Sequence, residues 1–476
     1  MKTFLYDKLN TRILEKKLGK KNIPSLLLMM RAGHDLYEIV KKKFNYDQII
    51  AIAGPGNNGG DAIAFSIQAK LNNENIILVN LSKRKNNSKK LLFLLNSIGL
   101  KEQSFNNSIL KSRKKILILD GILGIGISRK PEGLIEKTIK LINKSKKKNI
   151  NIVSIDIPSG LNPDTGIAYP NTICANHTIM CLTRKQGCYT GDGLKFAGEL
   201  LFTDLGITNS NKIQKVSSLL LDNKNKVLIK RKKTAHKGKF GNVLILGGWD
   251  NMPGAANLSA LAALKTGCGK VFICTNNFNK LPNEVIRIPA KLESISKIID
   301  KMDVAIAGPG LGNNGDEILK YLWKKKIPLV LDADGINWLA TNSLKRRRRR
   351  TLLIGTPHHG EARNLLGMEF RNRFEAIKNM HNKYGGRWVL KGPGTLVINN
   401  NNMYINDFSN SILASAGTGD VLAGIIGALI AQKNKHPEVA GVIIHTIAAK
   451  KILAEGQKTL VAGDLLKKIG SSIEFY

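Results

Sequence analysis

The sequence predicts an α/β protein built from two domains, and three observations carry this prediction. Short apolar runs that end in glycine or aspartate alternate with stretches of helical length, which is the pattern of a parallel sheet covered by helices. The pattern stops at a Lys- and Asn-rich passage, Thr208 to Lys226, and then begins again. The length of 476 residues also exceeds that of one ordinary domain. We therefore expect domains over residues 1–213 and 225–476.

The first half contains four runs with the length and composition of buried strands. They are Ile49–Ala53, Ile76–Asn80, Ile116–Leu119 and Ile152–Ile157. Between the first two lie the glycine-rich segment Gly54–Asp61 and a helical stretch, Ala62–Leu71. Helices on both faces of such a sheet would give a Rossmann-like, three-layer parallel domain.

The second half repeats the alternation with its own strands and one well-patterned helix. The strands are expected within Gly241–Gly248 and over Val304–Ala307, Leu329–Leu331, Leu352–Ile354 and Trp388–Leu390. The helix is expected over Asp420–Gln432, directly after Gly417-Thr418-Gly419. The second domain is therefore also predicted to be α/β.

Composition excludes several classes of protein. Hydrophobic residues make up 43% of the chain, which is too much for a disordered basic tail. The longest clean apolar stretch, Val421–Ala431, is about half of the ~20 residues that cross a bilayer. The N-terminus, Met1 to Lys17, mixes charges with hydrophobics and lacks a signal peptide's core. We expect a cytoplasmic protein with no membrane partner, whose five cysteines are small buried hydrophobes.

The formal net charge of +39 permits two interpretations. A basic surface can attract nucleic acid or other anions. Alternatively, Lys and Asn have accumulated wherever a surface position is free to vary, and we favour this because aromatics, which stack on bases, make up only 6%. The run Arg346–Arg350 is predicted to be an exposed loop, since adjacent guanidinium groups repel one another.

In the first half, polar groups gather where strands end. Glycines between a strand and a helix, as in Gly54–Asp61, allow a phosphate or dinucleotide to approach the backbone. Asp120 and Asp156 follow two further strands, and Gly124 to Lys130 forms a second flexible, cationic loop at the same predicted edge. The oxygen atoms of Asn58, Asp120 and Ser159 suit a hard cation.

These segments resemble the NAD(P)H-hydrate epimerase family over nearly all of residues 1–213. The resemblance rests on GPGNNGGD at 54–61, the segment Asp120–Lys130 and VSIDIPSGLNPDTG at 153–166. It implies that Asp156 contacts the substrate and exchanges its proton, and that Asn58, Asp120 and Ser159 hold K⁺. It also implies a set of substrate-binding residues: Asn57, Asn58, Gly59, Gly60, Asp61, Gly124, Ile125, Gly126, Ile127, Ser128, Arg129, Lys130 and Asp156.

In the second half, the segment Ser415–Asp420 precedes an apolar helix and has the chemistry of a phosphoryl-transfer site. Its glycines allow close approach, and amides at a helix start stabilise negative charge. Asp420 can act as general base toward a hydroxyl, although an acidic residue in a first helical turn can also simply favour the helix. Lys391–Thr395 could hold a nucleotide, and Asp332 with Asp334 could hold Mg²⁺. His358 lies in a loop at the same predicted edge.

The second half resembles the ribokinase-like superfamily, specifically its ADP- or ATP-dependent NAD(P)H-hydrate dehydratase branch, over about residues 225–476. The ordered matches run from His236-Lys237-Gly238 through Gly308–Gly312, Leu331–Asp334 and Pro357–Glu361 to Gly417–Gly424. The resemblance implies that Asp420 is catalytic, and that Ala255, Gly310, His358 and Asp420 contact the hydrate. The implied nucleotide-binding residues are Lys391, Gly392, Pro393, Gly394, Thr395 and Gly419.

Together the two resemblances imply a bifunctional repair enzyme. It would interconvert the R and S hydrates of NADH and NADPH and dehydrate the S form, using ADP or ATP with Mg²⁺, as a homo-oligomer. One alternative is a vitamin or sugar kinase fused to a nucleotide-binding domain, which would accumulate a stable phosphate ester. Another is an RNA-binding protein, whose binding would depend steeply on salt.

Overall fold

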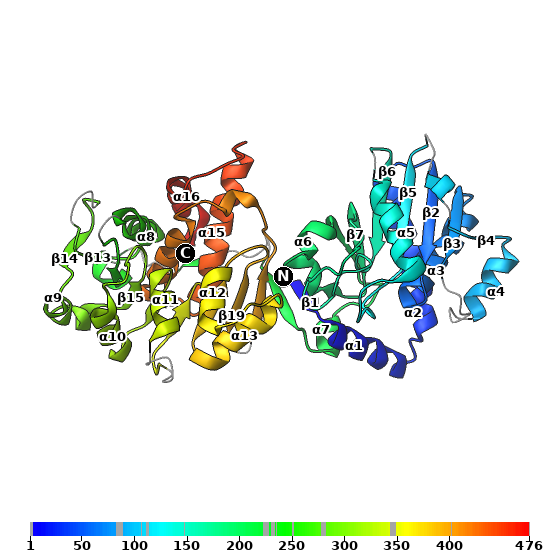
Figure 1. Ribbon diagram of the computed structural model, residues 1–476. Coiled ribbons are helices and arrows are strands. Elements are labelled where there is room, and N and C mark those ends of the chain that lie inside the picture. Colours follow the sequence, from blue (N-terminus) through cyan, green and yellow to red (C-terminus); the bar gives the residue numbers. More distant parts are fainter. Residues whose placement is uncertain are drawn as a thin grey trace. The chain divides into compact units, whose positions relative to one another are not determined.

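The computed structural model describes residues 3–81, 89–105, 107–110, 114–146, 148–221, 228–229, 234, 236–249, 252–277, 282–342, 349–400 and 402–475. The chain divides into two compact units, one of Phe4–Leu219 and one made mainly of Leu220–Tyr476. Figure 1 shows both units with their elements labelled. The two are described separately below.

The N-terminal unit is built on a parallel sheet. Its described strands run in the order β4-β3-β2-β5-β6-β7-β9, and every neighbouring pair is parallel. The bounds are β1 (Thr3–Tyr6), β2 (Gln48–Ala53), β3 (Ile76–Asn80), β4 (Glu102–Gln103), β5 (Ile116–Gly121), β6 (Ile150–Ile155), β7 (His177–Cys181), β8 (Arg184–Lys185), β9 (Glu199–Thr203) and β10 (Ser218–Leu221). The helices are α1 (Lys8–Lys20), α2 (Ser25–Lys43), α3 (Asn57–Leu71), α4 (Lys89–Ser97), α5 (Gly133–Lys144), α6 (Gly193–Phe196) and α7 (Ser210–Ile213).

Both faces of this sheet are covered, because successive side chains of a strand point to opposite faces. Leu117 and Leu119 of β5 join the core formed with α1, α2 and α3. Ile116 and Ile118 of the same strand join the core that includes Ile139 of α5. The unit therefore has the predicted three layers (Figure 1).

The C-terminal unit has a larger sheet, in which strands run in the order β14-β13-β12-β15-β16-β17-β18-β19-β20. The pairs are parallel as far as β18, and β19 and β20 are antiparallel additions. The strand bounds are β11 (Leu228–Ile229), β12 (Asn242–Leu246), β13 (Lys270–Thr275), β14 (Ile286–Pro289), β15 (Val304–Ala307), β16 (Leu329–Leu331), β17 (Leu353–Gly355), β18 (Arg387–Leu390), β19 (Leu396–Asn399), β20 (Asn402–Asn406) and β21 (Glu474–Phe475). The helices are α8 (Pro253–Thr266), α9 (Leu292–Ser296), α10 (Asp316–Lys324), α11 (Asp334–Thr341), α12 (His359–Leu366), α13 (Arg373–Tyr384), α14 (Thr418–Ala431), α15 (Pro437–Ala454) and α16 (Ala462–Ile469).

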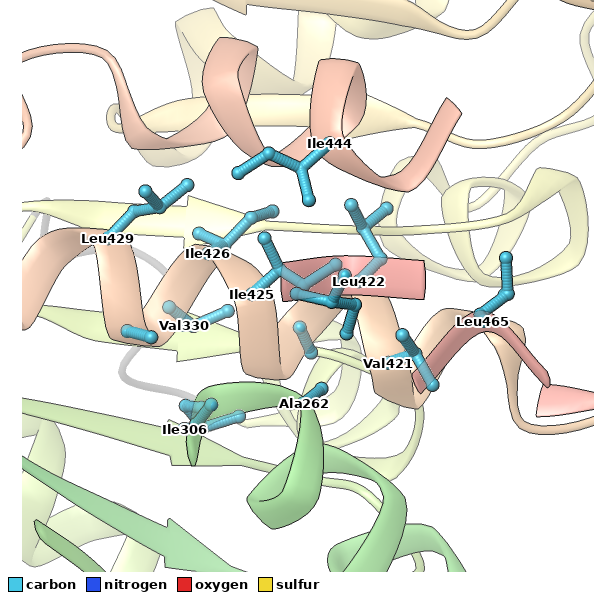
Figure 2. Close-up of a cluster of buried hydrophobic side chains, with 14 of the residues drawn as sticks. Ala262, Ile306, Val330, Val421, Leu422, Ile425, Ile426, Leu429, Ile444 and Leu465 are labelled. Atoms are coloured by element: carbon cyan, nitrogen blue, oxygen red, sulfur yellow. The ribbon is translucent and has the colours of Figure 1, made fainter. Parts of the chain in front are cut away.

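Helix α14 is the centre of the core on one face of this sheet. Figure 2 shows its apolar side chains between sheet residues such as Ile306 and Val330 and residues of neighbouring helices such as Ile444. A Cβ at Gly427 would lie 2.4 Å from Ile306 Cδ1, so glycine lets the helix approach this side chain closely. This packing fixes the N-terminus of α14, which carries Asp420, against the sheet edge.

Most predicted elements are confirmed, and three details are corrected. Helix α3 begins at Asn57 rather than Ala62, so the glycine-rich segment forms its first turn. The predicted linker contains α7 and β10 within its described part. Arg350 is exposed as expected, but Arg349 turns inward and donates to the carbonyls of Leu322, Trp323, Lys325 and Ile327, at and just beyond the C-terminal end of α10. Residues 346–348 lie outside the described residues.

Membrane insertion through a helix finds no support in the fold. Among the described residues, every helix is too short or too polar to cross a bilayer.

Candidate functional site

A cavity of about 580 Å³ opens in the N-terminal unit between the start of α3 and the loop after β5. The predicted residues that line it are Asn57, Asn58, Asp61, Gly124, Ile125, Gly126, Ile127, Ser128, Arg129, Lys130 and Asp156. Gly59 and Gly60 do not line it. A Cβ at Gly59 would lie 2.0 Å from the Gly54 carbonyl oxygen, and one at Gly60 would meet Met29. These two glycines therefore allow close packing at the helix start.

Asp156 follows β6 and has a left-handed backbone, with φ of 66°. Its Oδ1 accepts from the backbone N–H of Cys181 and pairs with the ammonium group of Lys185. Lys185 is buried and also donates to the carbonyls of Cys181 and Thr183, at 2.8 and 3.0 Å. The left-handed turn thus presents the Asp156 carboxylate to a buried cation that holds it in place.

A second cavity, of about 360 Å³, also reaches Asp156 and is lined by Lys185. Glu15 and Asp61 line both cavities. Burial raises the pKa of both carboxyls, and the negative charge of Asp156 adds to the rise. Groups with a raised pKa hold a proton where an ordinary carboxyl would not, so the site combines a paired carboxylate with candidate proton donors.

Asp120 lies within β5 and is completely buried. Its carboxylate accepts hydrogen bonds from Ser159 N and Oγ, at 3.0 and 2.6 Å, from Ser154 Oγ at 2.8 Å and from Ile122 N at 3.2 Å. Burial raises its pKa, and these hydrogen bonds oppose the rise. Ser159 Oγ and Asn58 Nδ2 both contact the Leu123 carbonyl. The structure therefore brings the three predicted metal ligands together.

In the C-terminal unit, Asp420 occupies the first turn of α14, after Gly417 with φ of 85°. Burial, followed by the charge of Asp332, raises the pKa of Asp420 to about 7. A direct pair with the Lys391 ammonium would lower the pKa of Asp420. Lys391 pairs with Asp332 instead, with its Nζ 2.7 Å from Asp332 Oδ1. A carboxyl with a pKa near neutrality can exchange its proton at physiological pH, as general-base catalysis requires.

The Mg²⁺ role of Asp332 and Asp334 stays a prediction, and the two side chains have separate partners in the structure. Asp332 pairs with Lys391 and accepts from Thr356 Oγ1, whereas Asp334 accepts from the backbone N–H of Gly312. The described residues contain no group of three His, Cys, Asp or Glu side chains that could hold a metal ion. The two side chains have different partners because Asp334 is already part of helix α11.

The predicted hydrate-contacting residues lie on loops around this edge of the sheet. A Cβ at Gly310 would lie 3.2 Å from the Cβ of Ala255, so these two residues adjoin. His358 caps α12: its Nδ1 accepts from Glu361 N, and Glu361 accepts from His358 N. The His358 side chain is still 59% exposed, and Glu361 lies 3.9 Å from Lys391 Nζ. A polar network thus joins His358 to Lys391 and Asp332.

A cavity of about 440 Å³ adjoins Lys391 and Gly419. It is also lined by Gly392, Pro393 and Thr395, whereas Gly394 does not line it. The buried guanidinium of Arg373 holds this loop by donating to the carbonyls of Leu390, Lys391, Pro393 and Gly394. The predicted nucleotide-binding loop therefore forms one wall of this cavity.

Comparison with known proteins agrees with this division into two sites. Residues 25–187 match the family model described as YjeF-related protein N-terminus, and residues 243–471 match that described as NAD(P)H-hydrate dehydratase. A bifunctional NAD(P)H-hydrate repair enzyme Nnr of Coxiella burnetii is 32% identical, over 97% of this chain and 98% of that protein. The Escherichia coli enzyme of the same name is also 32% identical, over 93% and 88%.

The chain belongs to the bifunctional NAD(P)H-hydrate repair enzyme family. The resemblance of both halves, and with it the prediction of a two-part enzyme, is confirmed. Among solved structures, the Bacillus subtilis ADP/ATP-dependent NAD(P)H-hydrate dehydratase, co-crystallised with ATP/Mg²⁺, is 28% identical and matches with a TM-score of 0.45. The match covers 52% of this chain and 93% of the Bacillus subtilis chain.

Two groups of this repair-enzyme chain were missed as site residues by the sequence analysis. Lys185 is absent from the predicted set, because its role depends on a turn 29 residues earlier that carries Asp156. His445 was not considered, because a lone histidine in an apolar helix such as α15 usually indicates core packing. The structure instead places it in the wall of the cavity beside Lys391.

Proposed function

We propose that this chain repairs hydrated NADH and NADPH in two steps. The N-terminal unit interconverts the R and S hydrates, and the C-terminal unit dehydrates the S form at the expense of ADP, giving AMP and phosphate. The observation that carries the proposal is Asp420: a carboxyl with a pKa of about 7, in the first turn of an apolar helix beside a lysine-lined cavity.

For epimerisation, a proton must leave and return at the hydroxyl of the saturated ring carbon. Asp156 is suited to take it up, because the pairing with Lys185 fixes the carboxylate where both cavities meet. In a ring-opened route, the O–H electrons form the carbonyl as the ring C–N bond breaks, and closure on the other carbonyl face gives the second epimer. Asp61 and Glu15, whose pKa values are raised by burial, are the candidate proton donors nearby.

For dehydration, hydroxide must first become a better leaving group. Asp420 takes the proton of the substrate hydroxyl, whose oxygen then attacks the terminal phosphorus of ADP while the bond to AMP breaks. The amides at the start of α14 stabilise the transferring phosphoryl group. Loss of phosphate from the ring carbon and of a proton from its neighbour then restores the dihydronicotinamide.

Two metal ions enter this proposal differently. The oxygen set of Asn58, Asp120 and Ser159 fits K⁺, because Asp120 is a buried carboxylate with no side-chain cation paired to it in the described part of the chain. K⁺ there would supply the balancing charge and fix the loop after β5. Mg²⁺ has no comparable protein cage, so we expect it to arrive on the nucleotide phosphates.

The cytoplasmic location, the homo-oligomer and the absence of a nucleic-acid partner stay predictions from the sequence. The residue roles proposed above are equally open to direct test.

The first test follows absorbance of the dihydronicotinamide band after the full chain is mixed with both NADH-hydrate epimers, K⁺, Mg²⁺ and ADP. Complete recovery of NADH is expected, because epimerisation feeds the dehydratase. No recovery with ADP or ATP would overturn the dehydratase proposal, and a stable phosphate ester would favour the vitamin or sugar kinase.

Two isosteric variants separate the activities. Asp420→Asn should reduce the rate of NADH recovery about 10³-fold, which is within the usual range for loss of a general base. Asp156→Asn should leave an initial phase intact and stop at the starting fraction of the S epimer. If Asp156→Asn still gave complete recovery at the wild-type rate, Asp156 would not be the proton acceptor.

A further inference from the structure

His445 of α15 lies in the wall of the cavity beside Lys391, and its hydrogen bonding fixes which ring nitrogen is free. His445 Nε2 lies 3.0 Å from the carbonyl oxygen of Thr418. A carbonyl oxygen only accepts, so Nε2 must carry the proton. In the neutral ring, Nδ1 is then a lone-pair acceptor.

The ring is neutral over the working range of pH. The side chain is nine-tenths buried, and burial lowers the pKa of His445 to about 4. Among the described residues, Nδ1 has no hydrogen-bond partner, whereas the side chain as a whole lines the cavity. A lone-pair nitrogen on the wall of a cavity is available to a hydrogen-bond donor of the ligand that fills the cavity.

The surroundings of His445 indicate which part of a nucleotide lies there. Lys391 and Gly419, near the start of α14, mark the phosphate end of the cavity. Leu422 lies one turn beyond Thr418 on α14, and Val442 lies one turn before His445 on α15; both line the cavity. Apolar walls of this kind accommodate a base, and they adjoin the imidazole.

We infer that His445 determines base specificity: its Nδ1 accepts a hydrogen bond from the exocyclic 6-amino group of adenine. Hypoxanthine and guanine carry a carbonyl oxygen at this position, which would face the lone pair of Nδ1. A 6-oxopurine nucleotide is therefore excluded both by a lost hydrogen bond and by repulsion between two acceptors. The inference rests on the proposed function, because it takes an adenine nucleotide as the occupant of this cavity.

The chain offers a matched pair of variants. The amide of Gln places its nitrogen near the position of Nε2, so His445→Gln can keep the bond to Thr418 and removes the acceptor at the Nδ1 position. The amide of Asn lies near the position of Nδ1, so His445→Asn can keep an acceptor there and loses the Thr418 bond. A general packing defect would affect both variants alike.

The experiment compares ADP, inosine diphosphate and the diphosphate of purine riboside, which carries hydrogen at position 6. In the wild type, kcat/KM for dehydration should fall about tenfold from ADP to the purine analogue and further for inosine diphosphate. His445→Gln should use ADP and the purine analogue within about twofold of each other, and His445→Asn should retain the preference for ADP.

Binding of the same nucleotides to the full chain, measured by calorimetry, separates this inference from the proposed function. Preferential binding of ADP without turnover would support the inference and overturn the dehydratase. Turnover with no preference among the three bases would overturn the inference and leave the dehydratase intact. If ADP and inosine diphosphate gave equal kcat/KM while 2′-deoxy-ADP gave a lower one, a ribose hydroxyl would be the group at Nδ1. That result would also overturn the inference. Failure of ADP to bind would overturn both.

Discussion

The two sites use the same pair of residue types, an aspartate and a lysine, in opposite ways. In the N-terminal unit, Lys185 pairs directly with Asp156, the proposed proton acceptor. In the C-terminal unit, Lys391 pairs with Asp332 and leaves Asp420 without an ion-pair partner among the described residues. Burial and the charge of Asp332 raise the pKa of Asp420 to about 7, because Lys391 opposes this rise only in part.

The position of a lysine therefore decides what a nearby carboxyl can do. The Asp156 carboxylate is held in place by its partner, and Asp61 and Glu15, whose pKa values are raised, can carry further exchangeable protons. A carboxyl beside a lysine that is already engaged becomes the exchangeable group itself. The following predictions test the comparison, beginning with the largest expected effect.

Removing the lysine should cost the N-terminal unit most. Lys185→Met should lower the free energy of unfolding of this unit by about 3 kcal/mol, because it leaves Asp156 as a buried charge without its partner. Hydrogen exchange of amides in β5 and β6 measures the change. The four tryptophans, Trp249, Trp323, Trp338 and Trp388, all belong to the C-terminal unit, so tryptophan emission during urea unfolding should not change.

Lys43→Met is the matched control, because Lys43 pairs with Glu199 at the surface of the same unit. Exposed pairs of this kind contribute at most about 1 kcal/mol. Equal losses for the two variants would contradict the distinction between a buried and an exposed pair.

The pH dependence of dehydration should follow Asp420. The base must be unprotonated, so kcat/KM should rise about tenfold between pH 6 and pH 8 around a pKa of about 7. Stability has the opposite sign: the folded state holds this proton more tightly than the unfolded state. The associated stability is present below the ordinary carboxyl pKa and is lost as the pH rises through 7.

Asp332→Asn sharpens this test, because it removes a negative charge and frees Lys391 to pair with Asp420. The midpoint of the kcat/KM profile should therefore move below 7. An unchanged midpoint would show that another group controls the profile.

The smallest predicted effect separates two partly buried arginines with the same kind of bonding. Arg373→Lys should raise the KM for ADP about fivefold with a smaller change in kcat, because one ammonium cannot replace a guanidinium on four carbonyls. Arg349→Lys loses an equivalent set of carbonyl bonds at the C-terminal end of α10, outside the cavity, and should leave the KM unchanged. Equal KM values for both variants would show that Arg373 acts only on stability.

Much of the fold could be predicted from the sequence where local signals agree. Ile76–Asn80, Val304–Ala307 and Leu329–Leu331 are strands with the predicted bounds, because each is a short β-branched and aliphatic run between turn formers. The early start of α3 was hidden, because Gly59 and Gly60 disfavour a helix in isolation. Their close contacts with Gly54 and Met29 compensate, and these contacts are tertiary.

The sites were predictable only in part, for the same reason. Asp156 and Asp420 stand in motifs that a reader of the sequence can find. The partners that set their chemistry come from elsewhere in the chain: Lys185 reaches Asp156, whereas Asp332 takes Lys391 away from Asp420. The Mg²⁺ role of Asp332 and Asp334 stays a prediction, and their spacing did not reveal that the two side chains have different partners.

The left-handed backbone at Asp156 also bears on how this chain can decay. Asp and Asn are the side chains that best tolerate this conformation after glycine. A single base change converts an Asp codon into an Asn codon. Asn is also frequent in this Lys- and Asn-rich sequence. Such a change would abolish the proton acceptor while preserving the turn. The buried Lys185 ammonium would lose its carboxylate partner at the same time, so a chain with this change would lose stability together with half of its chemistry.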